Sequence, residues 1–229
     1  MTDYLPAVAS ETDRLLESAR ALAPESLREP SLCAGWSRGH VLTHVARNGD
    51  AMVNLATWAT TGVVTPMYAS PGARDAEIAE GAGRPLEEQV ADLEDTAKRF
   101  AAIAARLRPE HDDVPVEARD GTRIRASTFP FMRLREVVFH HVDLDVGYGF
   151  ADVPDELTAT FLDNAVKRLQ RDPRAPALKI RTEEGDAYAI GDGTAYVTGP
   201  RAAVLAWIAR GLTDGVACDR QLPALPFGG

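Results

Sequence analysis

Apolar side chains recur every three or four positions in four segments of the first 145 residues, and this pattern restricts the fold more than the other features of the chain. The spacing places the apolar residues of each segment on one face of an α-helix. The segments cover residues 4–22, 37–62, 85–107 and 131–145. Helices with apolar inner faces and long connections are typical of four-helix bundles. The sequence therefore predicts an N-terminal four-helix bundle within residues 1–150.

Local signals mark the ends of these helices and the nature of their connections. Ser37 is suited to cap the second helix, and Pro85 is suited to open the third. The crossover 62–84 is long and rich in Gly and Pro, and connections of this length are often functional. Asp120 and Gly121 stand between two β-prone runs, which predicts a short hairpin.

A change of pattern after "GYGFADVP" marks the start of a second domain, which we expect to cover residues 151–229. A helix near 155–171 precedes two β-prone runs, "LKIRT" and "AYVTG", and another helix follows from Pro200. Because strands and helices share this part, it is expected to be a small α+β domain, and the whole chain falls in the α+β class. We interpret "GDGTAYVTG" as a hairpin turn rather than a phosphate loop, because a strand and not a helix follows its glycines.

Charge and cysteine content narrow the classes of partner. The formal net charge is −9, which argues against nucleic acid or an anionic membrane, since both require a basic surface. An anionic substrate would need a local cluster of positive charge. Cys33 and Cys218 lie far apart without a CxxC pattern, which indicates a reducing cytoplasm and packing or tail positions for both. The N-terminal segment lacks the apolar region of a signal peptide, and no segment predicts a membrane span.

The stretch "REVVFHHVDLD" places a glutamate and two histidines in an otherwise apolar helical segment. Glu136 and His140 are four residues apart and therefore share a helix face, whereas His141 is rotated by about 140° from Glu136. Asp143 lies roughly on the His140 side. His40 and His44 repeat the same spacing on another predicted helix. Two facing helices that each project such side chains inward form a common metal-site architecture.

Simpler interpretations of these residues are also open. A single inward histidine is usually a hydrogen-bonded core residue, and a glutamate four residues before a histidine can be a surface pair worth a few tenths of a kcal/mol. However, the valines around Glu136 indicate a buried helix, where a carboxylate without a cation is costly. The sequence lacks HExxH, GxSxG, Walker A and a complete GxGxxG. Trp36 and Trp58 are expected in the core rather than as a cofactor platform.

Three blocks together resemble the mycothiol-dependent maleylpyruvate isomerases of the DinB-like thiol-dependent metalloenzymes: "GWSRGHVLTHVARNGDAMVNL", "ATTGVVTPMYASPGARDAEIAEG" and "MRLREVVFHHVDL". The resemblance implies a DinB-like four-helix bundle that holds a divalent metal, generally zinc, followed by a small C-terminal domain. It places the metal ligands at His44, Glu136 and His140. It places a catalytic arginine at Arg210 in "ARGLTDGV", where one residue is inserted relative to the family pattern.

The resemblance also implies a reaction. Family members use the thiol of mycothiol, activated by the metal, to convert maleylpyruvate into fumarylpyruvate, a step of gentisate-type aromatic degradation. Two imidazoles and one carboxylate leave zinc with a net +1 charge and an open position, at which a thiol loses its proton. Arg210 would hold a carboxylate or enolate of the dianionic substrate. His40 would accept the thiol proton, contact substrate or support a ligand, or it is simply a hydrogen-bonded histidine at a helix start.

Two alternatives to the isomerase stay open on the sequence. A mycothiol S-transferase would use the same thiolate to conjugate electrophiles. A non-catalytic metal-binding module would complete its zinc site with a fourth protein ligand, for which His40 is the candidate. The quoted crossover block and "RGLTDGV" favour the isomerase. The sequence sets no oligomeric state.

Overall fold

The structure, a computed structural model, describes residues 3–226 of the chain, so that the last three residues of the predicted second domain lie outside the described part. The chain divides into two compact units, of which the first ends at Val146 and the second begins at Gly147. Each unit has its own helices, and strands are present in both. The predicted α+β class is confirmed.

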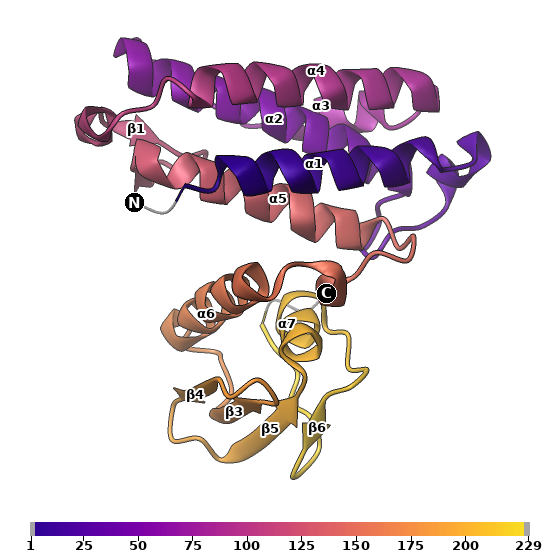
Figure 1. Ribbon diagram of the computed structural model, residues 1–229, viewed down its shortest axis with the longest axis vertical. Helices are drawn as coiled ribbons and strands as arrows, with labels where there is room; N and C mark the ends of the chain where they lie inside the picture. Colours follow the sequence, from indigo (N-terminus) through magenta and orange to yellow (C-terminus); the bar gives the residue numbers. More distant parts are fainter. Residues whose placement is uncertain (1–2, 227–229) are drawn as a thin grey trace. The chain divides into compact units, whose positions relative to one another are not determined.

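The first unit is built from the four predicted helices. They are α1 (Leu5–Arg20), α2 (Arg38–Thr61), α4 (Leu86–Ala104) and α5 (Phe129–Asp143). Each of α1 and α2 packs against both α4 and α5, and Figure 1 shows α1 running beside α5. Leucine, valine and alanine side chains from these helices fill the core between them, as the apolar spacing predicts.

The ends of α2 follow from side-chain chemistry. Its N-cap is Ser37, whose backbone N–H and hydroxyl both lie within hydrogen-bond distance of Nδ1 of His40, at 3.3 and 2.8 Å. This closes a capping box at the start of the helix. Gly62 ends the helix in the left-handed region at φ 72°, a conformation that glycine adopts without steric cost.

The crossover 62–84 contains a helix that the sequence pattern does not predict, α3 (Ala73–Gly81), which packs against α2. With nine residues and Ile78 as its buried large apolar side chain, α3 is too short to show a helical period. Two glycines permit the close approach. A Cβ on Gly39 would lie 2.4 Å from the Ala82 carbonyl oxygen, and one on Gly81 would lie 2.5 Å from Cγ2 of Thr43.

The predicted hairpin is present and precedes α5. Strand β1 (Val116–Glu117) pairs antiparallel with β2 (Arg123–Ile124), and the turn between them carries Arg119 and Asp120. Four short 3₁₀ turns complete the connections of the two units: Pro24–Arg28, Pro109–Asp113, Ala126–Thr128 and Phe150–Asp152.

The second unit is a four-stranded sheet with two helices, α6 (Asp155–Arg171) and α7 (Arg201–Arg210), which pack against each other (Figure 1). Its strands are β3 (Leu178–Thr182), β4 (Ala187–Ile190), β5 (Ala195–Gly199) and β6 (Ala217–Cys218). Their order is β4-β3-β5-β6, with β3 and β5 parallel. The prediction of a hairpin at "GDGTAYVTG" is therefore wrong, because β3 lies between the two strands that this turn connects.

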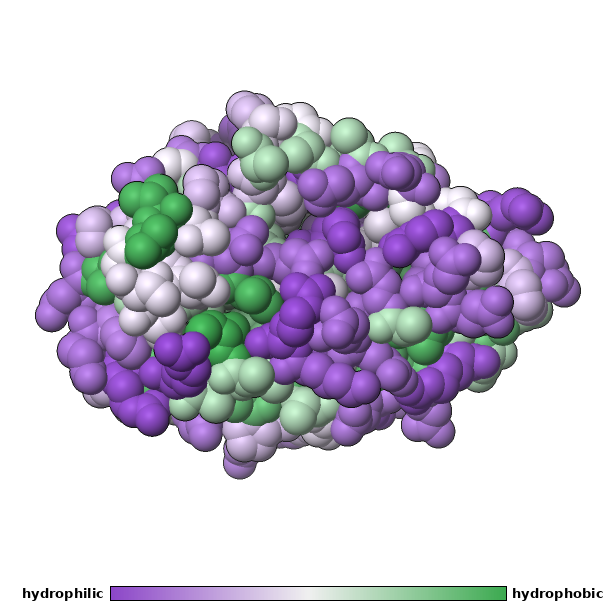
Figure 2. Space-filling view, turned by 90° about the horizontal axis from the view of Figure 1, so that it is seen from above, coloured by the Kyte–Doolittle hydropathy of each residue, from purple (hydrophilic) through white to green (hydrophobic). Residues whose placement is uncertain are grey.

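None of the helices within residues 3–226 is both long and apolar enough to cross a membrane. Figure 2 shows one face of the molecule, on which hydrophilic residues predominate and hydrophobic residues form small separate groups. The large hydrophobic side chains that the described part exposes include Val63 and Val64 at the start of the crossover.

Candidate metal centre

Three of the predicted ligands lie together in the first unit. His44 comes from the second turn of α2, and Glu136 and His140 come from successive turns of α5. The Nε2 atoms of His44 and His140 lie 3.2 and 3.5 Å from Oε2 of Glu136. One possible ligand atom from each residue lies within 4.8 Å of those of the other two. The helical spacing and the packing of α2 on α5 thus bring one carboxylate and two imidazoles to one point.

These separations fit a single small cation. A tetrahedral ion that is about 2.0–2.1 Å from nitrogen and oxygen ligands separates those ligands by about 3.3 Å. The two imidazole rings meet edge to face with their centroids 4.4 Å apart. Two nitrogen donors and one carboxylate oxygen form a ligand set that catalytic zinc uses, with the remaining position left for another group.

The protonation equilibria of the three residues show that this point favours positive charge. Burial raises the pKa of Glu136, but hydrogen bonds from His140 and His44 outweigh it and hold the pKa well below its usual value. Burial lowers the pKa of His140, but Asp143, Cys33 and Glu136 together raise it well above 6.5. Burial lowers the pKa of His44 to about 4. A metal cation bound at Nε2 of His140 would take the place of a proton on that ring.

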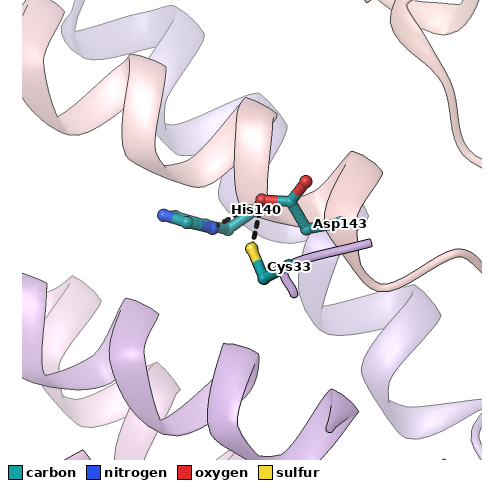
Figure 3. A group of neighbouring side chains, drawn as sticks. All are labelled: Cys33, His140 and Asp143. Carbon is teal, nitrogen blue, oxygen red and sulfur yellow. Dashed lines mark hydrogen bonds and ion pairs between the residues drawn. The ribbon is translucent and has the colours of Figure 1, made fainter. Parts of the chain in front are cut away.

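A carboxylate on the far side of His140 fixes the orientation of its ring (Figure 3). Oδ2 of Asp143 lies 2.8 Å from Nδ1 of His140, and it also accepts a hydrogen bond from the Cys33 thiol at 3.2 Å. Asp143 is fully buried. Such a carboxylate holds a ligand imidazole in the tautomer that presents Nε2 to a metal. Cys33 is therefore more than a packing residue, since its thiol touches the carboxylate that orients a predicted ligand.

The same three residues, Cys33, His140 and Asp143, are also close enough together to hold an ion by themselves. The surroundings favour the trio of His44, Glu136 and His140. All three of its members line a cavity of about 510 Å³, whereas Cys33 and Asp143 do not. Because a catalytic ion needs an accessible position, the trio on the Nε2 side of His140 is the better candidate for a metal site.

The cavity that the trio lines is polar, and several of its other side chains are positively charged. It is lined by Asn48, Met52, Met67, Tyr68, Arg74, Ala118, Arg119, Asp120, Met132 and Arg135 in addition to the three predicted ligands. The three arginines escaped the sequence analysis, although Arg135 directly precedes Glu136 and Arg74 lies in the crossover that was expected to be functional. Two larger cavities of about 880 and 870 Å³, formed by described residues of the first unit, contain none of the trio.

Comparison with known proteins identifies the family of the chain. The family model described as the mycothiol maleylpyruvate isomerase N-terminal domain matches residues 8–145, which is more than half of the chain. The chain belongs to the mycothiol maleylpyruvate isomerase family. The matched residues include His44, Glu136, His140 and the other residues that line the cavity.

Solved structures extend this likeness to the second unit. The crystal structure of the mycothiol-dependent maleylpyruvate isomerase superposes with a TM-score of 0.90 at 28% sequence identity, and the match covers 99% of each chain. A histidine-to-alanine mutant of that enzyme gives the same values. A search of curated proteins found no match.

In this member of the isomerase family, His40 and His141 each lie within hydrogen-bond distance of a serine hydroxyl. His40 does not line the cavity, and its Nδ1 atom is occupied by Ser37 at the helix start. This geometry favours the helix-start alternative for His40, and a catalytic role stays a prediction. His141 is buried and points to α1, where its Nε2 atom lies 2.8 Å from the Ser18 hydroxyl oxygen. The rotation of about 140° therefore turns His141 toward a neighbouring helix.

Trp36 lies beside the site and not in the core proper. Its ring centroid is 5.3 Å from that of His44 and 6.5 Å from that of His140, and the Arg74 guanidinium lies 5.6 Å from it. Trp58 is buried, as expected. The expectation of a core position therefore holds for Trp58, whereas Trp36 is partly exposed and lies beside the imidazoles of His44 and His140.

Arg210, the arginine that the family resemblance makes catalytic, is the last residue of α7 in the second unit. Gly211 follows in the left-handed region at φ 71° and ends the helix. An amino group of Arg210 donates to the Ala209 carbonyl at 2.8 Å. Its catalytic role stays a prediction for this family member.

Proposed function

We propose that the protein catalyses the mycothiol-dependent isomerisation of maleylpyruvate to fumarylpyruvate, a step in gentisate-type aromatic degradation. The observation that carries this proposal is the family match over residues 8–145, which contains the trio His44, Glu136 and His140 at one cavity. The relatives of solved structure are described as mycothiol-dependent maleylpyruvate isomerases. We also infer a cytoplasmic location, because a reduced thiol cofactor and two free cysteines, far apart in the sequence, suit a reducing compartment.

His44, Glu136 and His140 would hold the divalent metal, for which zinc is the first candidate. When bound, the metal lowers the pKa of the mycothiol thiol, whose reversible addition to the cis double bond lets that bond rotate before the thiol leaves. His44 is ready to bind because its pKa of about 4 keeps it neutral at pH 7. His140 must release its proton first, and Asp143 then holds its Nδ1–H.

We propose different roles for the two domains. The bundle, residues 1–150, carries the metal ligands, and the domain of residues 151–229 supplies Arg210. A guanidinium suits a carboxylate or an enolate, because its planar fork of N–H donors matches two oxygens. A donor of this kind that faces developing enolate charge is worth about 3–4 kcal/mol of transition-state stabilisation.

The test is a conversion assay. Purified zinc-loaded protein is mixed with maleylpyruvate in the presence and absence of mycothiol, and conversion to fumarylpyruvate is followed by absorbance. We expect turnover only with the thiol. Chelation should abolish it, and added zinc should restore it. Absence of thiol-dependent conversion would refute the isomerase, and stable conjugation of mycothiol to electrophiles in its place would establish the S-transferase.

A pair of matched variants tests the site. Glu136→Gln removes the charge of the central ligand, whereas Glu88→Gln makes the same chemical change at an exposed position of α4. We expect loss of bound zinc and of turnover in the first variant and neither in the second. A Glu136→Gln protein that keeps both would exclude the proposed metal site.

A further inference from the structure

We propose that Arg74 and Arg135 are the carboxylate-binding groups of the cavity, one beside His44 and one beside Glu136, and that they select a small dicarboxylate. Arg119 adds positive charge from the β1–β2 turn. The inference rests on the proposed function for the identity of the substrate, but the binding of a dicarboxylate can be measured without any turnover. These arginines belong to the first unit and are additional to Arg210.

Arg74 is held in place from two sides. It lies in the first turn of α3, its guanidinium is 5.6 Å from the centre of the Trp36 ring, and one amino group pairs with Asp75 at 2.6 Å. The other amino group lies 3.4 Å from Nδ1 of His44. Stacking on an aromatic ring fixes the plane of a guanidinium and leaves its N–H edge available.

The contact of Arg74 with His44 is satisfied only while Nδ1 of the imidazole carries no hydrogen and accepts a hydrogen bond from the guanidinium. When Nε2 of His44 binds a metal, Nδ1 carries the hydrogen, and two N–H donors then face each other. That amino group of Arg74 needs an acceptor from elsewhere. A carboxylate in the cavity supplies one, because it accepts two parallel hydrogen bonds from a guanidinium.

Arg135, on α5, lies beside Glu136 in the way that Arg74 lies beside His44. Its amino group lies 3.5 Å from Oε1 of Glu136, and the side chain is about one-third exposed at the cavity. In the metal-loaded site the charge of Glu136 is shared with the ion, which leaves Arg135 without a full counter-charge. The two guanidinium groups thus flank the trio on different helices, α3 and α5.

The balance of charge in the cavity points to an anion. Among the described residues that line it, three arginines face two carboxylates, those of Glu136 and Asp120. The cavity lining is therefore positive on a chain whose net charge is −9, and a divalent ion adds to this excess. Its volume of about 510 Å³ lies within the usual range for small-molecule sites. Two separated guanidinium groups favour a ligand with a carboxylate at each end.

Direct binding tests this inference. The probes are fumarate, which has two carboxylates, and crotonate, which has the same carbon skeleton with one. Each is titrated into the zinc-loaded full chain without mycothiol, with intrinsic tryptophan fluorescence and calorimetry as readouts. We expect fumarate to bind more tightly than crotonate. Arg74→Gln and Arg135→Gln should each weaken fumarate binding by about 10- to 100-fold, as expected for the loss of a charge-assisted hydrogen bond.

Arg99→Gln is the matched control, because Arg99 also pairs with neighbouring carboxylates, Asp50 and Asp95, but does not line the cavity. It should leave fumarate binding unchanged. Unchanged fumarate binding in Arg74→Gln and Arg135→Gln would overturn the inference, as would equal binding of the two probes by the unmodified protein. Loss of zinc in either variant would also overturn it, since the arginine would then support the metal site itself.

The isomerase assay separates this inference from the proposed function. If the protein turns over maleylpyruvate, both variants should raise KM by a larger factor than they lower kcat. If it does not, the proposed function fails, and the fumarate titrations decide the inference by themselves.

Discussion

The replacement of Gly39 by alanine tests how α3 is held against α2. The added Cβ would lie 2.4 Å from the Ala82 carbonyl oxygen and 3.3 Å from the Leu27 carbonyl oxygen. Both neighbours are backbone atoms, so no side-chain rotation relieves the contact. Since unstrained heavy-atom contacts begin near 3.5 Å, the two segments must separate by about 1 Å.

The magnitude follows from two opposing effects. Overpacking of this kind costs about 1–3 kcal/mol, and alanine gains up to about 1 kcal/mol over glycine in a helix interior. Gly39 lies in the first turn, where that gain is smaller, so we expect a net loss of about 2 kcal/mol. For a chain of this length, such a loss lowers Tm by about 4–8 °C.

Gly83→Ala is the matched control, because a Cβ on Gly83 would meet nothing within 4 Å. It should leave the stability unchanged or raise it by a few tenths of a kcal/mol. Thermal and urea unfolding, followed by circular dichroism, measure both variants. Since α3 carries Arg74 to His44, Gly39→Ala should also lose more activity per folded molecule than Gly83→Ala. Equal stability of the two variants would refute the reasoning.

Three further outcomes are expected. Asp143→Asn should weaken zinc binding by about 10- to 100-fold in a competition assay with a chromogenic chelator, because the His140 ring loses its buried carboxylate, and unchanged affinity would contradict that role. The metal-free protein should lose up to about 1.4 kcal/mol of stability per pH unit as the pH falls from about 6.5 to 5, since the unfolded chain protonates His44 first, and urea titrations should show a shallower slope in His44→Gln. Arg210→Ala should lose about 10²–10³-fold in kcat while it keeps its zinc, and loss of the metal would exclude a role in substrate binding alone.

The helices of the first unit were predictable because their signals are local. A repeated apolar spacing and the cap at Ser37 define α2, and both can be read within one segment. The helix α3 was missed because nine residues with one large buried apolar side chain carry too little periodicity. The strand order of the second unit was missed because the parallel pairing of β3 with β5 depends on contacts between distant segments.

In the candidate site, too, local spacing predicted some relations between residues, and others depend on the packing of distant segments. Glu136 and His140 share a face by helical spacing alone, whereas His44 joins them only through the packing of α2 on α5. Arg74 and Arg119 reach the cavity from a crossover and a hairpin turn, so no spacing rule relates them to the ligands. The rotation of His141 away from Glu136 was predicted, but Ser18 as its partner follows only from the position of α1.

Because the predicted ligands are far apart in the sequence, the proposed metal would also stabilise the fold. His44 and Glu136 are 92 residues apart, and one ion bound to both would join α2 to α5 as a reversible cross-link. A cross-link that closes a loop of this length removes about 4–5 kcal/mol of chain entropy from the unfolded state in the polymer model used for disulfides. The ion that we propose as the activator of the thiol would therefore also stabilise the bundle, and the unfolding temperature of the protein would report the fraction of molecules that carry metal.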